Sequence, residues 1–187
     1  MDMRTVSFTK MENGTAEEYS FLSTLYAKCR KNVPDMLLAL LKQMQGDRMG
    51  YQVDRYTHSL QSATRAKRDG ADEETIVCAL LHDIGDVLAP ANHSEVAAAI
   101  LRPYVSERNY WIIRYHGLFQ GYYYFEKINK DRNARDRYKE HLHYQACIDC
   151  CHNWDQCSFD PNYDTLPLEN FEPMLKRVFQ QPINIFD

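Results

Sequence analysis

The side chains in this sequence that could do chemistry are seven histidines and some of the 26 acidic residues. Six of them fall inside predicted helices or at their ends: His58, His82, Asp83, His93, His116 and Asp155. Imidazole nitrogens and carboxylate oxygens together suit iron, manganese or zinc, and one carboxylate can bridge two cations. A single histidine is more often a surface or capping residue. The hypothesis of a metal centre therefore depends on the six occurring together.

Helical periodicity runs through nearly the whole chain and predicts the elements that must position these side chains. Helices are expected over about 15–29, 34–45, 54–67, 72–81, 92–102, 106–116 and 167–179, with two more near 131–154. Asn92 is expected to cap the helix that contains His93, and Gly117 to end the helix that contains His116. No stretch alternates polar and apolar residues for long enough to predict a sheet.

The prediction is therefore one all-α domain over residues 1–187. It has N-terminal helices at 15–45, a metal-binding core at about 54–155 and a C-terminal helix at 167–180. A length of 187 residues is usual for one domain.

Charge and hydropathy exclude several classes of protein. The formal net charge of −4 excludes a nucleic-acid binder held by a strongly basic surface. Residues 1–14 lack the apolar stretch of a secretory signal, and the longest apolar run, 36–41, is too short to span a bilayer. The six cysteines are expected to be reduced thiols, as in a cytoplasmic protein. A small molecule is the expected partner, with no membrane or nucleic acid, and the oligomeric state stays open.

The order of the candidate ligands resembles a known motif. His58, then His82-Asp83 after 24 residues, then a distant Asp155 resemble the H…HD…D metal motif of the HD-domain superfamily. His82-Asp83-Ile84-Gly85 has the usual HDIG form of that motif. The resemblance implies an HD-domain helical bundle. It also implies a divalent ion held by those four ligands, as in many phosphohydrolases of the superfamily.

Two further histidines resemble the binuclear branch of the superfamily. His93 and His116 lie between the HD pair and the last aspartate, and by this resemblance they would hold a second metal, with Asp83 bridging. Two groups have such a six-ligand set: the HD phosphodiesterases, and the mixed-valent diiron oxygenases that include myo-inositol oxygenase and enzymes that cleave hydroxyphosphonates. The segment 58–63, HSLQSA, is similar to the EHSLQxA helix of the phosphonate-cleaving oxygenases, with Thr where Glu is usual.

The resemblance to those oxygenases implies a non-haem diiron enzyme with two Fe ions, an Fe(II)/Fe(III) pair, and O₂ as co-substrate. The metal centre itself would be catalytic, without a separate acid or base. The best match among substrates is 1-hydroxy-2-(trimethylammonio)ethylphosphonate, cleaved to glycine betaine and phosphate, or a 2-amino analogue. A metal-dependent HD phosphohydrolase or phosphodiesterase is the alternative. A non-catalytic HD-fold protein would be expected to have lost at least one of the six ligands.

The residues that would anchor a phosphonate depart from that subfamily. Gln120 and His152 stand where a Lys and an Arg are usual, so that anchoring pair is not carried over. Gln120 remains a candidate substrate contact. Arg132 and Arg135, three residues apart on a predicted helix, are candidate replacements for the missing cations. The alternative for these arginines is a solvated helix with internal ion pairs.

Aromatic residues near the candidate ligands suggest how an ammonium group would bind. Tyr51 and Asp54 precede His58, and Asp54 lies four residues before it, one turn away on the same predicted helix face. The aromatic run 122–125 follows His116. A quaternary ammonium group cannot donate hydrogen bonds, so aromatic rings with a nearby carboxylate would suit it. The alternative for these rings is packing in the core or at an interface.

Overall fold

A computed structural model describes residues 5–183, so both ends of the predicted domain, 1–4 and 184–187, lie outside the described range. The α-helices in this range are α1 (Ala16–Lys31), α2 (Val33–Gln43), α3 (Arg55–Arg68), α4 (Glu73–Leu81), α5 (His93–Leu101), α6 (Glu107–Gln120), α7 (Tyr144–Cys150) and α8 (Glu172–Val178). Short 3₁₀ turns cover Met11–Asn13, Ile84–Val87, Pro90–Asn92, Gly121–Tyr123, Phe125–Ile128, Ala134–Tyr138 and Leu168–Asn170. A π-helical turn, Cys151–Asp155, follows α7. Residues 5–183 contain no β-strand, which confirms the predicted all-α fold.

Side-chain caps begin the helices that carry most of the candidate ligands. Thr15 and Glu18 form a reciprocal capping box at the start of α1. Asp54, Asp72 and Ser106 each accept a hydrogen bond from the backbone N–H three residues later, at the starts of α3, α4 and α6. Such caps satisfy backbone donors that the first helical turn leaves unpaired. They fix the residue at which each helix begins, and so the direction in which its side chains point.

Two features of α5 and α6 differ from the sequence prediction. Asn92 makes no side-chain hydrogen bond to the start of α5, which follows a 3₁₀ turn directly. Helix α6 does not end at Gly117 but continues to Gln120. Gly117 faces α5, where a β-carbon would lie 2.7 Å from the Ser94 hydroxyl. The glycine therefore permits close packing of two helices and does not mark a helix end.

The predicted helices near 131–154 and 167–179 are only partly present. Residues 134–138 form a 3₁₀ turn, and the Asp131 carboxylate accepts a hydrogen bond from the Asn133 backbone N–H just before it. Local bonds of this kind compete with α-helix formation. At the C-terminal side, α8 begins only at Glu172, because Pro173 favours the first turn of a helix over its interior.

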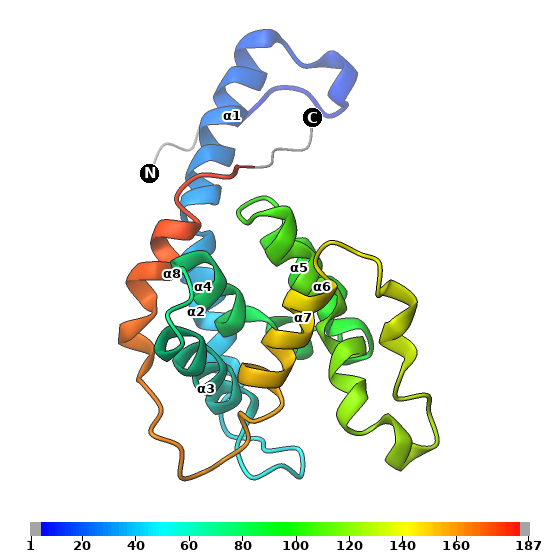
Figure 1. Cartoon of the computed structure of the whole chain (residues 1–187). Helices are drawn as coiled ribbons and strands as arrows, with labels where there is room; N and C mark the ends of the chain where they lie inside the picture. Colours follow the sequence, from blue (N-terminus) through cyan, green and yellow to red (C-terminus); the bar gives the residue numbers. More distant parts are fainter. Residues whose placement is uncertain (1–4, 184–187) are drawn as a thin grey trace.

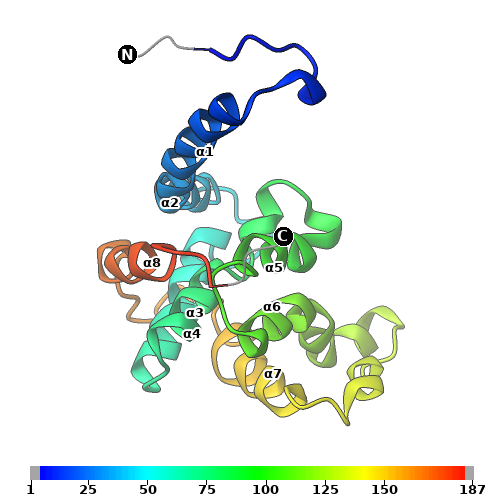
Figure 2. The same cartoon turned by 90° about the horizontal axis from the view of Figure 1, so that it is seen from above.

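The helices form two groups with α1 projecting away from them (Figures 1 and 2). Helix α3 packs on α4, which also contacts α8, while α5 packs on α6 and α6 packs on α7. The π-helical turn after α7 contacts both α3 and α6, so it joins the two groups. Large, fully buried side chains come from both groups: Leu41, Leu80, Leu81, Ile84, Leu101, Ile113, Phe119, Phe171 and Leu175. None of the described helices has both the length and the apolar character needed to cross a bilayer.

Candidate metal centre

The six predicted ligands lie together where the two helix groups meet. They come from α3, the residues just after α4, the start of α5, α6 and the π-helical turn: His58, His82, Asp83, His93, His116 and Asp155. Five of them are at most 6% exposed, and the side chain of His93 is 26% exposed. Packing of these helices thus brings together side chains that are up to 97 positions apart in the sequence, from 58 to 155.

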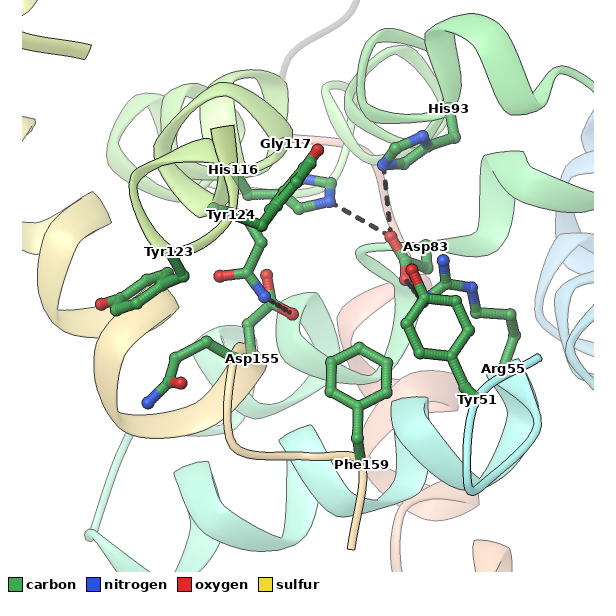
Figure 3. Close-up of a pocket in the computed structure, with 12 residues that line it drawn as sticks. Tyr51, Arg55, Asp83, His93, His116, Gly117, Tyr123, Tyr124, Asp155 and Phe159 are labelled. Atoms are coloured by element: carbon green, nitrogen blue, oxygen red, sulfur yellow. Dashed lines mark hydrogen bonds and ion pairs between the residues drawn. The ribbon is translucent and has the colours of Figure 1, made fainter. Parts of the chain in front are cut away.

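Asp83 lies between two pairs of histidines. Its Oδ2 atom is 3.4 Å from Nε2 of His58 and 3.5 Å from Nε2 of His82. Its Oδ1 atom is 3.4 Å from Nε2 of His93 and 3.2 Å from Nε2 of His116, and both contacts are visible in Figure 3. Because each oxygen faces a different pair of imidazoles, this one carboxylate is placed to bridge two cations.

Asp155 completes the first of these two groups. Its Oδ1 atom is 3.3 Å from Nε2 of His58 and accepts a hydrogen bond of 2.8 Å from the Gln120 amide. Its Oδ2 atom is buried and has no hydrogen-bond partner. Two sets of donor atoms are close enough together to hold a metal ion: His58, His82 and Asp155, and His82, Asp83 and His116. His93 belongs to neither set.

Backbone carbonyl groups fix three of the imidazole rings. Nδ1 of His58, His82 and His116 lies 2.9, 2.8 and 2.7 Å, respectively, from a carbonyl oxygen. A carbonyl oxygen only accepts, so Nδ1 of each ring is the donor in these bonds, and Nε2 faces the cluster, where it can serve as a metal ligand. This orientation is typical of metal-binding histidines. Together with the unpartnered oxygen of Asp155, it shows that the donor set fits bound cations.

The electrostatics of the cluster favour positive charge. Burial opposes the charged form of His82, but Asp83 and Asp155 outweigh it and raise the pKa of His82 to about 9. Burial likewise opposes ionisation of both aspartates, yet the surrounding histidines hold the pKa of each carboxyl below its usual range. A pair of buried carboxylates that stays ionised in this way attracts a cation strongly.

The sequence matches the model of the HD domain family over residues 55–149, about half of the chain. The chain belongs to the HD-domain family. No curated protein matches the sequence. Of the six clustered side chains, Asp155 lies beyond the matched residues. Family and cluster together indicate a metal-dependent enzyme.

His93, the partly exposed histidine of the cluster, is held by residues that were not predicted. Nδ1 of His93 is 3.2 Å from Oδ1 of Asp86, whose Oδ2 is 3.2 Å from Nε of Arg55. A β-carbon on Gly85 would collide with the backbone of His93, so glycine permits the start of α5 to approach the HD pair. Arg55 is three residues before His58, and Asp86 is three residues after Asp83. One-turn spacing from a ligand was the sequence signal that could have found them.

A pocket of about 260 Å³ opens onto the candidate metal centre (Figure 3). Besides ligands of the cluster, its lining includes Tyr51, Arg55, Gln120, Tyr123, Tyr124 and Phe159. The structure thus places Tyr51 and Gln120, two of the predicted substrate residues, beside the candidate ligands. The Tyr51 ring stacks on Phe159, with ring centres 5.0 Å apart, and Phe159 stacks on His58 at 4.3 Å. Phe159 was missed because its contact with His58 joins residues far apart in the sequence.

Asp54 does not line the pocket. Its carboxylate accepts hydrogen bonds from the backbone N–H groups of Gly46 and Thr57, so it caps α3 and anchors the preceding loop. The prediction assumed that Asp54 and His58 share a helix face. Asp54 has extended backbone angles and precedes the first helical residue, so the one-turn relation fails there.

Arg132 and Arg135 also lie outside the lining of the pocket. Their guanidinium carbons are 4.2 and 3.8 Å from the centre of the Tyr122 ring, and Arg132 forms an ion pair of 3.2 Å with Glu126. The predicted α-helix that would have aimed both arginines at the substrate is absent, because residues 134–138 form a 3₁₀ turn. The prediction that these arginines replace the usual phosphonate anchors is not supported.

Proposed function

We propose that this HD protein is a non-haem diiron oxygenase that uses O₂ to cleave the C–P bond of a small 1-hydroxyphosphonate. The observation that carries the proposal is the position of Asp83, with one oxygen facing His58 and His82 and the other facing His93 and His116. Such a carboxylate serves a pair of cations better than a single one. Imidazole and carboxylate donors suit iron.

Each ion would be held by its own group of residues. The first would be bound by His58, His82, Asp83 and Asp155, and the second by Asp83, His93 and His116. When bound, an Fe(II)/Fe(III) pair would supply the activation of O₂ and the oxidation of the carbon that carries the hydroxyl group. The C–H and C–P bonds of that carbon break, and O₂ accepts four electrons. Each product gains one oxygen atom, and one proton is released.

The size and polarity of the pocket support a compact substrate. Its volume of about 260 Å³ falls just below the range of roughly 300–1,000 Å³ that drug-sized ligands occupy. Oε1 of Gln120 is buried without a hydrogen-bond partner, while the amide nitrogen of this side chain donates to Asp155. That oxygen would accept a hydrogen bond from the hydroxyl group or an amino group of the substrate.

The aromatic lining supports a substrate with an ammonium group, either 2-amino or trimethylammonio. The guanidinium carbon of Arg55 already lies 4.8 Å from the centre of the Tyr51 ring. Tyr124, which lines the same pocket and is 44% exposed, is therefore the better ring for a substrate cation. This differs from the sequence hypothesis, in which Tyr51 has that role.

Membership of the HD family supports a second candidate function, a metal-dependent phosphohydrolase or phosphodiesterase. The same donors could hold Mn²⁺ or Mg²⁺ and activate water toward a phosphate ester. Two parallel assays separate these functions. Iron-loaded protein is given the 2-amino or the trimethylammonio hydroxyphosphonate in an oxygen electrode, and the released phosphate is measured. Mn²⁺-loaded protein is given a phosphate ester, and the released phosphate is measured in the same way. The oxygenase predicts equal consumption of O₂ and release of phosphate. Phosphate ester hydrolysis with Mn²⁺, without O₂ uptake on any hydroxyphosphonate, would favour the hydrolase.

A further inference from the structure

We propose that Arg55 binds the acidic oxygen atoms of the substrate and so makes this pocket specific for an oxyanion next to the metal centre. The identity of that oxyanion as a phosphonate rests on the proposed function. The role of Arg55 as its anchor rests on the geometry around the guanidinium group.

Arg55 is the one arginine or lysine among the described residues that line the pocket. Gln120 occupies the position of one usual phosphonate anchor, and Arg132 and Arg135 lie outside the lining. An anionic substrate placed in this pocket therefore meets a single permanent positive charge from the protein. The side chain of Arg55 is 22% exposed, so that charge is partly shielded from water and interacts more strongly than a surface charge would.

The neighbours of Arg55 hold it in place without using all of its donors. Nε lies 3.2 Å from Asp86 and Nη1 lies 3.6 Å from Asp83, while the Tyr51 ring lies against the guanidinium carbon. These two ion pairs involve two of the three guanidinium nitrogens. A guanidinium has five N–H donors in a rigid fork suited to two oxygens of a phosphonate or carboxylate. Donors therefore remain for an anion.

The position of Arg55 also decides which part of the substrate faces the metal ligands. Nη1 approaches the same Oδ2 atom of Asp83 that lies beside His58 and His82. In a 1-hydroxyphosphonate, the acidic group and the hydroxyl group are attached to the same carbon. An acid group bound at Arg55 thus keeps that carbon next to the candidate ligands, and the ammonium end extends toward Tyr124.

The alternative is that Arg55 only neutralises Asp83 and Asp86. The test measures the affinity of the iron-loaded full-length protein for methylphosphonate by anaerobic titration calorimetry, with iron content and melting temperature recorded for each variant. Arg55→Met removes the charge, and Arg55→Gln removes it but keeps N–H donors for Asp86. Arg65→Met is the matched control, because Arg65 is also on α3 and half-buried, donates to the Cys157 carbonyl and does not line the pocket.

We expect each Arg55 variant to weaken methylphosphonate binding by at least ~10-fold per loaded site, since a hydrogen bond to a charged group contributes about 1.5–3 kcal/mol. Arg65→Met should leave the affinity unchanged. Equal affinity in wild type and Arg55→Gln, or no methylphosphonate binding to wild type, would overturn the proposal. Binding that depends on Arg55 in a protein that consumes no O₂ would support the anchor and reject the oxygenase.

Discussion

Nε2 of His58 lies 3.0 Å from Nε2 of His82 in the centre of the cluster. Nδ1 of each ring donates to a carbonyl oxygen, so two lone pairs would face each other at this distance if neither Nε2 carried a proton. Only a proton or a metal ion between or beside the rings makes this arrangement favourable. The backbone of α3 and α4 therefore holds these histidines in a geometry that a cation stabilises.

The first prediction concerns removal of the metal. A ligand at 100 times its dissociation constant stabilises the folded state by about 2.7 kcal/mol, which corresponds to roughly 5–10 °C in melting temperature for a chain of this length. We expect a chelator to lower the melting temperature by about this amount, and added Fe(II) to restore it. An unchanged melting temperature, with metal shown to be absent, would mean that the cluster does not bind metal in the folded state.

His93→Ala should separate the two ions. His93 is the most exposed of the six candidate ligands and approaches Asp83 at Oδ1, whereas His58 approaches it at Oδ2, so the loss of His93 should spare the group around His58. We expect a folded protein with about half of the iron and no oxygenase activity, measured by elemental analysis and an oxygen electrode. His141→Ala is the control, because His141 is exposed and stacks on Trp111 away from the cluster. Full retention of iron in His93→Ala would remove His93 from the ligand set.

Gly85→Ala tests the close approach of α5 to the HD pair. A β-carbon at this position collides with the backbone of His93, and overpacking of a tight contact typically costs about 1–3 kcal/mol. We expect a loss of that size in the free energy of unfolding, measured with urea, together with weaker binding of the second iron. Ala99→Ser, on the exposed side of α5, should change stability by less than about 0.5 kcal/mol. Wild-type stability in Gly85→Ala would show that α5 can shift at no cost.

Tyr124→Leu tests the aromatic contact with the substrate cation. A cation–π contact contributes about 0.5–2 kcal/mol, so the KM for the trimethylammonio substrate should rise roughly 2–30-fold, with little change in iron content. Tyr26→Leu serves as the control, because Tyr26 lies on the projecting helix α1 and is 65% exposed. If KM is unchanged in Tyr124→Leu, the ammonium group binds elsewhere in the pocket.

The sequence was sufficient to predict those site residues that a motif or a position on a helix identifies. The spacing from His58 to His82-Asp83, read with helical periodicity, predicts the side chains that the fold brings together. Prediction failed where local backbone geometry overrides periodicity. Asp54 is a cap and not a helical residue, and Gly117 lies inside a helix because α5 packs against it. Phe159 has no local signal, since only tertiary packing places it against His58.

Arg55, the arginine that lines the pocket, was missed for the same reason, because tertiary packing supplies its contacts. Arg55 lies on the helix of His58, yet its contacts with Asp83 and Asp86 come from the segment after α4. Charge and spacing alone make Arg132 and Arg135 candidates, and that spacing has meaning only if residues 131–138 form an α-helix. They do not, because side-chain bonds such as that from the Asn133 backbone to Asp131 stabilise turns there.

The diiron centre is tested most directly by the metal content of the protein, combined with an EPR spectrum of partly reduced protein produced in iron-rich medium. A diiron centre predicts about two irons per chain and a signal from a coupled Fe(II)/Fe(III) pair, because Asp83 faces two histidine pairs. Bound manganese, magnesium or zinc, with no iron-dependent O₂ uptake after reconstitution, would contradict it.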